Sequence, residues 1–139
     1  MSKHILIVDD DTAIAGFYTR YLTFEGYRVT IAESCADADA LLATWRPDII
    51  IADWWLPDAD GDVWASSLRM RPNVADIPII VVTGRDLPRA TINRLNDYKI
   101  MRFQKPFSLE EFSATLAHLL VSTPNGRSLN TKRDAPLRV

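Results

Sequence analysis

The chain has 139 residues, 47% of them hydrophobic and 24% charged, which is typical of one ordinary globular domain. Residues 122–139 hold four basic residues against one acid, a net charge of +3, so the first 121 residues carry about −5 of the formal total of −2. An acidic domain of this kind gives no reason to expect nucleic-acid binding. No apolar run approaches the roughly 20 residues of a membrane span, and the N-terminus lacks a signal-peptide pattern.

The single cysteine, Cys35, excludes an internal disulfide and is typical of a protein in a reducing compartment. We expect this thiol to pack inside a helix and not to react, because no neighbouring residue in the sequence would lower its pKa. The composition as a whole predicts a cytoplasmic protein.

The first predicted strand is the apolar run at residues 5–8, which leads into three consecutive acids at residues 9–11. Apolar residues at helical spacing follow over residues 14–22, and Gly26 is a typical helix stop. The chain therefore begins with a strand, an acidic turn and a helix.

A second strand is expected at residues 27–32, which alternate and are rich in β-forming residues. Ser34, with Asp37 three residues later, forms a capping-box pattern that predicts the start of a second helix. The next run, residues 49–52, is continuously apolar and ends in Asp53. Such a run is typical of a strand buried on both faces, as in a parallel sheet.

The second half of the chain continues the same alternation. It contains, in order, a turn at Asp60-Gly61, a short helix near residues 63–68, a strand at residues 79–82 that ends in Thr83, a helix at residues 87–98 and a strand at residues 100–103. A capping box at Ser108 and Glu111 predicts the last helix. We expect a domain over residues 1–121 and a flexible basic tail over residues 122–139.

Five strand-helix repeats with short connections predict a doubly wound α/β fold, because right-handed crossovers join parallel strands. In the flavodoxin-like five-stranded order 2-1-3-4-5, the order in which strands are added to the sheet reverses between the first and third strands. Ligands bind in the crevice at this switch point. Asp9, Asp10 and Asp53 would meet there. Asp53 is the candidate reactive centre.

Several carboxylates at one edge of a sheet repel each other unless a cation lies among them. Mg²⁺ suits such a place, because it accepts one or two carboxylates, a carbonyl oxygen and several waters. The candidate ligands are Asp9, Asp10, Asp53 and the backbone carbonyl of Trp55.

A carboxylate held in this way can also attack phosphorus and form an aspartyl phosphate. The phosphoryl oxygens then need hydrogen-bond donors. The hydroxyl of Thr83 and the ammonium of Lys105, which follows the fifth strand, are the candidates.

Motifs in this order and spacing resemble the receiver domain of bacterial two-component response regulators, of the chemotaxis-regulator-like kind. The similarity covers residues 4 to about 121 and is carried by Ile5 to Asp10, Asp53 with Pro57 and Gly61, Val82-Thr83-Gly84, and Lys105-Pro106-Phe107.

The resemblance implies that Asp53 accepts the phosphoryl group, that Asp9 and Asp10 hold Mg²⁺, and that Thr83 and Lys105 contact the phosphoryl group. It also implies a cis peptide bond before the proline that follows the lysine. The phosphoryl donor would be a phosphohistidine on a sensor histidine kinase or a phosphotransfer protein.

Some positions differ from the family pattern. Receivers usually carry Tyr or Phe three residues before the lysine, as a ring that swings inward on phosphorylation, and this chain has Arg102 there. Gly84 stands where alanine is usual, which makes room beside the phosphoryl site. Trp55 and Arg85 border the approach of the hydrolytic water in receivers, and their bulk predicts a long-lived phosphoryl group. Trp54 and Trp55 either pack in the loop or form an exposed platform for a partner.

The predicted function is a response-regulator receiver that is phosphorylated on Asp53 with Mg²⁺ and signals by protein-protein contacts to an unknown downstream partner. Its chemistry would be its own phosphorylation and dephosphorylation, not that of an enzyme with a separate substrate. The alternatives are a phosphorylation-independent pseudo-receiver and a Mg²⁺-dependent phosphatase. A homodimer through the fourth helix, fifth strand and fifth helix is compatible with the chain, which is either a stand-alone regulator or a piece of a longer protein.

Overall fold

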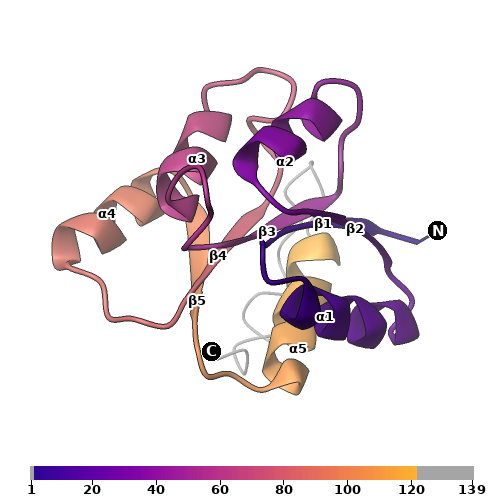
Figure 1. The fold of residues 1–139 in the computed structure, drawn as a ribbon. Coiled ribbons are helices and arrows are strands. Elements are labelled where there is room, and N and C mark those ends of the chain that lie inside the picture. The colour runs from indigo at the N-terminus through magenta and orange to yellow at the C-terminus, as the bar shows by residue number, and fades with distance from the viewer. Residues whose placement is uncertain (1, 122–139) are drawn as a thin grey trace. The chain divides into compact units, whose positions relative to one another are not determined.

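The computed structural model describes residues 2–121, and within this range it has five strands and five helices (Figure 1). The strands are β1 (His4–Val8), β2 (Arg28–Ala32), β3 (Ile49–Asp53), β4 (Ile79–Thr83) and β5 (Ile100–Gln104). The helices are α1 (Thr12–Phe24), α2 (Cys35–Leu42), α3 (Gly61–Leu68), α4 (Arg89–Asp97) and α5 (Leu109–Val121). The predicted tail at residues 122–139 lies outside the described residues.

The five strands form one parallel sheet in the order β2-β1-β3-β4-β5, which confirms the predicted doubly wound topology. Val8 at the end of β1 is opposite Ala52, and Asp53 at the end of β3 is opposite Val82. The central strands therefore end together, and the residues that follow them lie at one edge of the sheet.

Tertiary contacts divide the chain into two units, Met1–Lys105 and Pro106–Val139. The first unit contains the whole sheet, with α1 on one side of it and α2 and α3 on the other (Figure 1). In the second unit, the Ser108 hydroxyl oxygen accepts a hydrogen bond from the Glu111 N–H at 3.0 Å, so the predicted helix cap is present.

The core on the α2 and α3 side of the sheet is built from alternate strand residues, as the two-residue period of a strand requires. Leu6, Ile50 and Val81 belong to one apolar cluster with Leu42 of α2 and Leu68 of α3. All of these side chains are almost completely removed from water. This burial holds the helices on the sheet, because each apolar side chain of this size contributes about 1.5–3 kcal/mol on leaving water.

Local signals mark three helix ends, and those at Gly26 and Ser34 were predicted. The Asp11 carboxylate accepts a hydrogen bond from the Ile14 N–H at 3.1 Å and caps α1, and Gly26 follows that helix with a φ of 101°. The Ser34 hydroxyl oxygen accepts a hydrogen bond from the Asp37 N–H at 3.0 Å and caps α2.

Two details of the predicted helices are wrong. The helix expected from residue 87 begins at Arg89, because Pro88 is its extended N-cap and disfavours helical geometry at Leu87. The short helix expected near residues 63–68 begins at Gly61, and Val63 within it is 57% exposed, whereas Trp64, Ala65 and Leu68 are buried. Residues at positions i, i+1 and i+4 lie toward one side of a helix, so Val63 lies outside the side of α3 that packs on the core.

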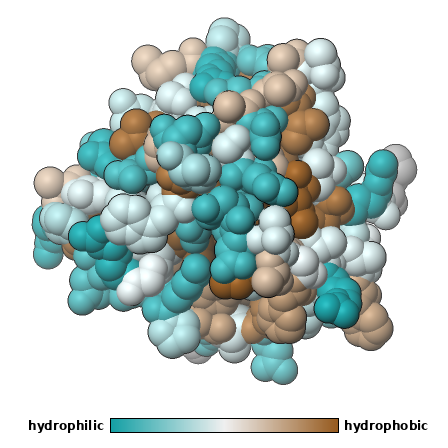
Figure 2. All heavy atoms as spheres, in the orientation of Figure 1, coloured by the Kyte–Doolittle hydropathy of each residue, from teal (hydrophilic) through white to brown (hydrophobic). Residues whose placement is uncertain are grey.

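The surface in view is mainly hydrophilic, with small hydrophobic patches between polar groups (Figure 2). Among residues 2–121, the large exposed apolar side chains include Phe17, Phe24, Trp55 and Met70. No helix in this range is long and apolar enough to cross a bilayer.

Candidate functional site

Asp53 and Lys105 approach each other at the edge where the parallel strands end. The Lys105 Nζ lies 3.4 Å from the Asp53 Oδ1, and the two side chains form an ion pair. Asp9 and Tyr18 line the same small pocket. These residues are far apart in the sequence. They lie at the ends of three different strands or in α1, and they face one concave site.

The backbone orients the Asp53 carboxylate from the other side. The Trp55 N–H donates a hydrogen bond to the Asp53 Oδ2 at 3.1 Å. One carboxylate oxygen therefore faces the ammonium of Lys105 and the other accepts from the backbone. A carboxylate held in a fixed orientation is suited to act as a nucleophile.

The surroundings of Asp9 disfavour the ionised form of its carboxyl group. It is only 6% exposed, and its Oδ1 accepts one hydrogen bond, from the Asp11 N–H at 2.9 Å. The pKa of Asp9 is raised to about 6, chiefly by burial. The Asp11 N–H and the charge of Lys105 lower the pKa, and the negative charges of Asp53 and Asp10 raise it. The ionised form of Asp9 is therefore short of positive charge.

This shortage is the structural test of whether the site fits Mg²⁺. Asp9 and Asp53 face one pocket whose only lining cation among the described residues is Lys105, and Asp10 is exposed beside them. Within residues 2–121, no three His, Cys, Asp or Glu side chains are close enough to form a metal cage. Mg²⁺ is usually bound by one or two carboxylates and keeps several waters, so Asp9 and Asp53, which line one pocket, fit this ion.

Thr83 ends β4 and is 1% exposed. Its hydroxyl oxygen accepts a hydrogen bond from the Arg85 N–H at 3.2 Å, which leaves the hydroxyl proton available to a ligand. The Thr83 carbonyl accepts from the Lys105 N–H at 2.8 Å, so the chain just before the ammonium is tied to β4. Thr83 does not itself line the pocket of Asp9 and Asp53.

The two tryptophans after Asp53 have different roles. Trp54 is 7% exposed and belongs to the apolar core, whereas Trp55 is 56% exposed. The guanidinium carbon of Arg85 lies 5.2 Å from the Trp55 ring centre, in a cation-π contact. Trp54 therefore packs, as one alternative expected. Trp55 is exposed, and its use as a platform for a partner stays a prediction. The two residues predicted to lengthen the phosphoryl lifetime, Trp55 and Arg85, contact each other.

Gly61 and Gly84 stand in different surroundings. A Cβ at Gly61 would overlap the backbone carbonyl of Asp53, so α3 can begin against the end of β3 only with glycine there. The Gly61 N–H also donates to the Trp54 carbonyl at 2.7 Å. A Cβ at Gly84 would have the Lys105 Cβ as its nearest neighbour, at 4.0 Å, so this position has the expected room.

Arg102 occupies the predicted place on the edge strand β5, opposite Val81. Its side chain is half-buried, and no carboxylate among the described residues forms an ion pair with it. Phe103 next to it is 2% exposed, as expected for the opposite face of the strand.

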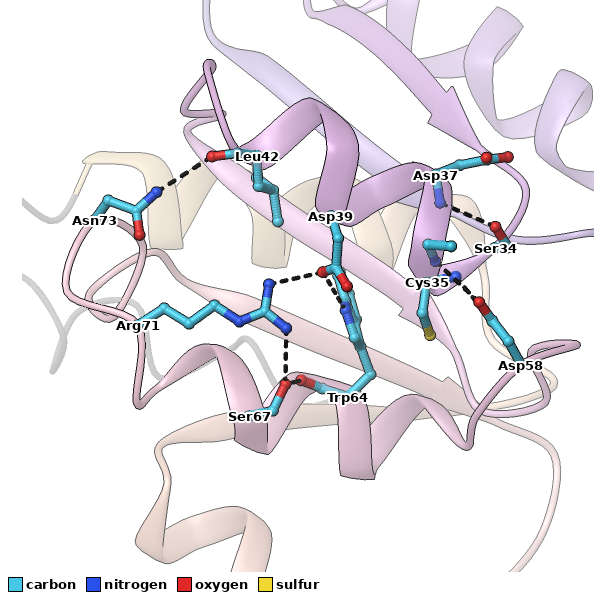
Figure 3. Close-up of polar contacts among 11 residues, drawn as sticks. Ser34, Cys35, Asp37, Asp39, Leu42, Asp58, Trp64, Ser67, Arg71 and Asn73 are labelled. Atoms are coloured by element: carbon cyan, nitrogen blue, oxygen red, sulfur yellow. Dashed lines mark hydrogen bonds and ion pairs between the residues drawn. The ribbon is translucent and has the colours of Figure 1, made fainter.

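Sequence reasoning missed Asp58, which lies in the loop after Asp53. Its two carboxylate oxygens accept hydrogen bonds from the N–H groups of Cys35 and Ala36, both at 2.9 Å, at the start of α2 (Figure 3). Burial, with the charge of Asp58, raises the pKa of the Cys35 thiol to about 12, so it stays protonated at neutral pH and packs as predicted.

Tyr18 was also missed as a site residue, because its spacing in α1 is explained by helix packing alone. Burial raises the pKa of Tyr18, and the charges of Asp9 and Asp53 add to this. Asp58 and the start of α2 are 22 and 23 positions apart in the sequence, and Tyr18 meets Asp53 of a different strand, so no local signal reports these contacts.

The family model of the response regulator receiver domain matches residues 5–117. Response regulator MprA of Mycobacterium ulcerans is 37% identical over 123 residues, which are 88% of this chain and 52% of that protein. MprA of Mycobacterium tuberculosis is likewise 37% identical over 123 residues. The chain spans about half the length of the curated relatives that it matches.

Solved structures of receiver domains are similar to this chain as well. Chemotaxis response regulator CheY4 of Vibrio cholerae has a TM-score of 0.77 at 26% identity, over 86% of this chain and all of that one. The receiver domain of a signal transduction histidine kinase from Syntrophus aciditrophicus has a TM-score of 0.81 at 26% identity, over 91% of this chain and 96% of that one. The chain belongs to the response regulator receiver domains of two-component systems.

Proposed function

We propose that this receiver accepts a phosphoryl group on Asp53 in a Mg²⁺-dependent step and passes the signal on by protein-protein contacts. The observation that carries the proposal is the Asp53 carboxylate, which is paired with the Lys105 ammonium at 3.4 Å and faces the cation-poor Asp9 in one pocket. A donor phosphohistidine would come from a sensor histidine kinase or a phosphotransfer protein.

In the proposed reaction, an Asp53 oxygen forms a bond to phosphorus as the phosphorus-nitrogen bond of the phosphohistidine breaks. The leaving nitrogen keeps the electron pair of that bond, and the imidazole is neutralised by solvent protons. Lys105 then neutralises a phosphoryl oxygen, and the Thr83 hydroxyl donates its free proton to another. Hydrolysis of the aspartyl phosphate by water restores the carboxylate, so no separate substrate is turned over.

Asp9, Asp10, Asp53 and the backbone carbonyl of Trp55 would hold Mg²⁺, which supplies positive charge to the acids and to the phosphoryl oxygens. Without the ion, the acids repel one another and an incoming phosphoryl group. The chain's own contribution is to hold Asp53 between the Trp55 N–H and the Lys105 ammonium.

The output is proposed to leave through the loop after Thr83 and through α4, in a cytoplasmic protein. Arg102 cannot fill an inward slot in place of an aromatic ring without burying an unpaired charge, so a ring swing is not available to this chain. The face of α4 and β5 is the proposed surface for a downstream protein or a second copy.

The test is phosphorylation of the whole chain by acetyl phosphate, with and without Mg²⁺, followed by intact-mass spectrometry. We expect a single added phosphoryl group that requires Mg²⁺ and is absent in Asp53→Asn. Asp76→Asn, which removes a surface carboxylate, should be phosphorylated like the wild type. Persistent phosphorylation of Asp53→Asn would contradict the assignment.

A beryllofluoride titration, followed by tryptophan fluorescence, separates this proposal from a pseudo-receiver. Trp54 adjoins Asp53 and is buried, so it should report a ligand on the carboxylate. A wild-type protein with no response and no phosphorylation would be a pseudo-receiver. Multiple turnover of a small phosphate ester through Asp53 would instead indicate a phosphatase.

A further inference from the structure

Asp62 is a carboxylate in a place where receivers have no need of one for phosphorylation. It lies in the first turn of α3 and is 2% exposed. Its Oδ2 pairs with the guanidinium of Arg94 in α4, and its Oδ1 is buried without a hydrogen-bond partner among the described residues. A buried acid with one unsatisfied oxygen is costly, so fold stability alone does not account for it.

The pair joins the phosphorylation site to a weakly held helix. Asp62 directly follows Gly61, which packs on the Asp53 carbonyl. Of the nine residues of α4, only Leu95 is buried, and no side chain caps its first turn. Among the described residues, Arg94 forms the ion pair between α4 and α3, and Arg69 at the end of α3 donates a hydrogen bond to the Tyr98 carbonyl at the end of α4. The ion pair is therefore the polar contact that holds α4 on α3 ahead of its C-terminal end.

We propose that the Asp62–Arg94 pair is a latch that holds α4 against α3 in the unphosphorylated protein and opens when Asp53 is phosphorylated. This inference rests on the proposed function. The latch sets how readily the receiver is activated, because any contact made in only one state shifts the equilibrium between the two. Binding at Asp53 and opening of the latch must therefore affect each other by the same factor.

The first measurement is amide hydrogen exchange over α4, residues 89–97, in the whole chain without a phosphoryl donor. Asp62→Asn removes the charge and keeps the shape of the side chain. The double variant Asp62→Leu with Arg94→Met replaces the pair by apolar side chains, so no buried charge is left unpaired to prevent folding. In both, we expect α4 amides to exchange about tenfold faster than in the wild type.

The second measurement is the beryllofluoride titration with Mg²⁺. The half-saturating concentration should fall about fivefold in both variants, because the latch no longer opposes the activated state. Asp39→Asn is the matched control: it removes the charge from an ion pair between α2 and the segment after α3, so α4 exchange and the titration should remain as in the wild type.

Wild-type α4 exchange in the folded double variant would overturn the latch, whatever the titration shows. Faster exchange with an unchanged titration would overturn its coupling to Asp53. A wild-type protein that does not bind beryllofluoride at all would refute the proposed function and the coupling with it, while the exchange data would still decide whether the pair holds α4.

Discussion

Helices α2 and α4 contribute to the same core cluster, yet they are attached in different ways. The Asp39 carboxylate of α2 accepts hydrogen bonds from the Trp64 Nε1 at 2.9 Å and from Arg71 at 2.7 Å, and the Asn73 side chain donates to the Leu42 carbonyl at 3.2 Å (Figure 3). These contacts connect the second half of α2 to α3 and to the segment after it.

The start of α2 is held as well, by Asp58 of the loop that follows Asp53. By contrast, α4 has one buried residue and the single ion pair of Arg94, and its C-terminal end is held by Arg69, which donates to the Tyr98 carbonyl at 2.7 Å. The first turn of α4, after the loop from Thr83, is the least attached part of this side of the molecule.

The difference between α2 and α4 indicates which helix can transmit a structural change. Hydrogen bonds connect α2, α3 and the loop after Asp53 to one another. This region can therefore keep the acids in place during phosphorylation and dephosphorylation. Few contacts have to break for α4 to shift, and regions of this kind open at low free energy. Four predictions test this difference between the region of α2 and the region of α4.

The largest effect is expected at the start of the fixed region. Gly61→Ala places a Cβ against the Asp53 carbonyl, so the backbone must shift and we expect a loss of about 3 kcal/mol in the free energy of unfolding. Urea unfolding measures it. Gly16→Ala is the control, because that position has open space and lies inside α1, where alanine favours the helix. Equal midpoints for the two variants would show that Gly61 is not sterically required.

Arg69→Met should cost about 2–3 kcal/mol, because four backbone carbonyls lose a donor. The Arg69 guanidinium donates to Ala75 and Ile77 at 3.0 and 2.6 Å before β4, and to Tyr98 and Lys99 at 2.7 and 3.0 Å after α4. Urea unfolding should show the loss, and hydrogen exchange should rise at the end of α4.

The control for Arg69 is Arg46→Met, whose ion pair with Asp76 has side chains that are 51% and 76% exposed. An exposed pair of this kind contributes at most about 1 kcal/mol. If both arginine variants lose the same stability, Arg69 is not the anchor of the α4 end.

A smaller effect concerns the contact between the two regions. Trp55 belongs to the fixed loop and Arg85 to the loop before α4, and their cation-π contact lies at the edge of the site. Trp55→Asn removes a bulky ring and adds an amide that can orient water, so phosphoryl loss should become about threefold faster. A decay time course after removal of the donor measures it. A variant that loses phosphate no faster than the wild type would refute the shielding role.

The smallest effect is a pH dependence at the start of α2. The N–H groups of Cys35 and Ala36 stabilise the ionised Asp58 and hold its pKa below the ordinary value of 3.8. A pKa that is lower in the folded than in the unfolded state gives stability above about pH 4, which is lost as the pH falls through the folded pKa. The difference in urea midpoint between the wild type and Asp58→Asn should therefore be present at neutral pH and shrink as the pH falls below the ordinary pKa of 3.8. A difference that does not change with pH would mean that the charge of Asp58 does not contribute.

Much of the site could be predicted from the sequence, because its signals are local or follow from topology. The apolar run before Asp53 indicates a buried strand, and the parallel order then brings Asp9 to the same edge. Lys105 follows the last strand and reaches Asp53 for the same reason. That Asp9, Asp10, Asp53 and the Trp55 carbonyl hold Mg²⁺ stays a prediction.

Other features could not be predicted, because they depend on which distant side chains meet. Adjacent tryptophans have the same sequence signal, but only the fold decides that Trp54 enters the core and Trp55 remains exposed. An acid after Asp60-Gly61 reads as a solvated residue of a first helical turn, yet Asp62 is buried beneath α4.

Three features of this protein follow from its sequence. Hydrophobic periodicity indicates the strands, capping chemistry indicates helix ends, and the handedness of crossovers indicates the edge at which the acids lie. Only the tertiary structure decided how firmly each helix is attached. Asp62 and Arg94 are 32 positions apart, and Arg69 and Lys99 are 30 apart. Hydrogen bonds and ion pairs over such separations form only when the packed core brings their partners within about 3 Å, and no local pattern encodes that distance.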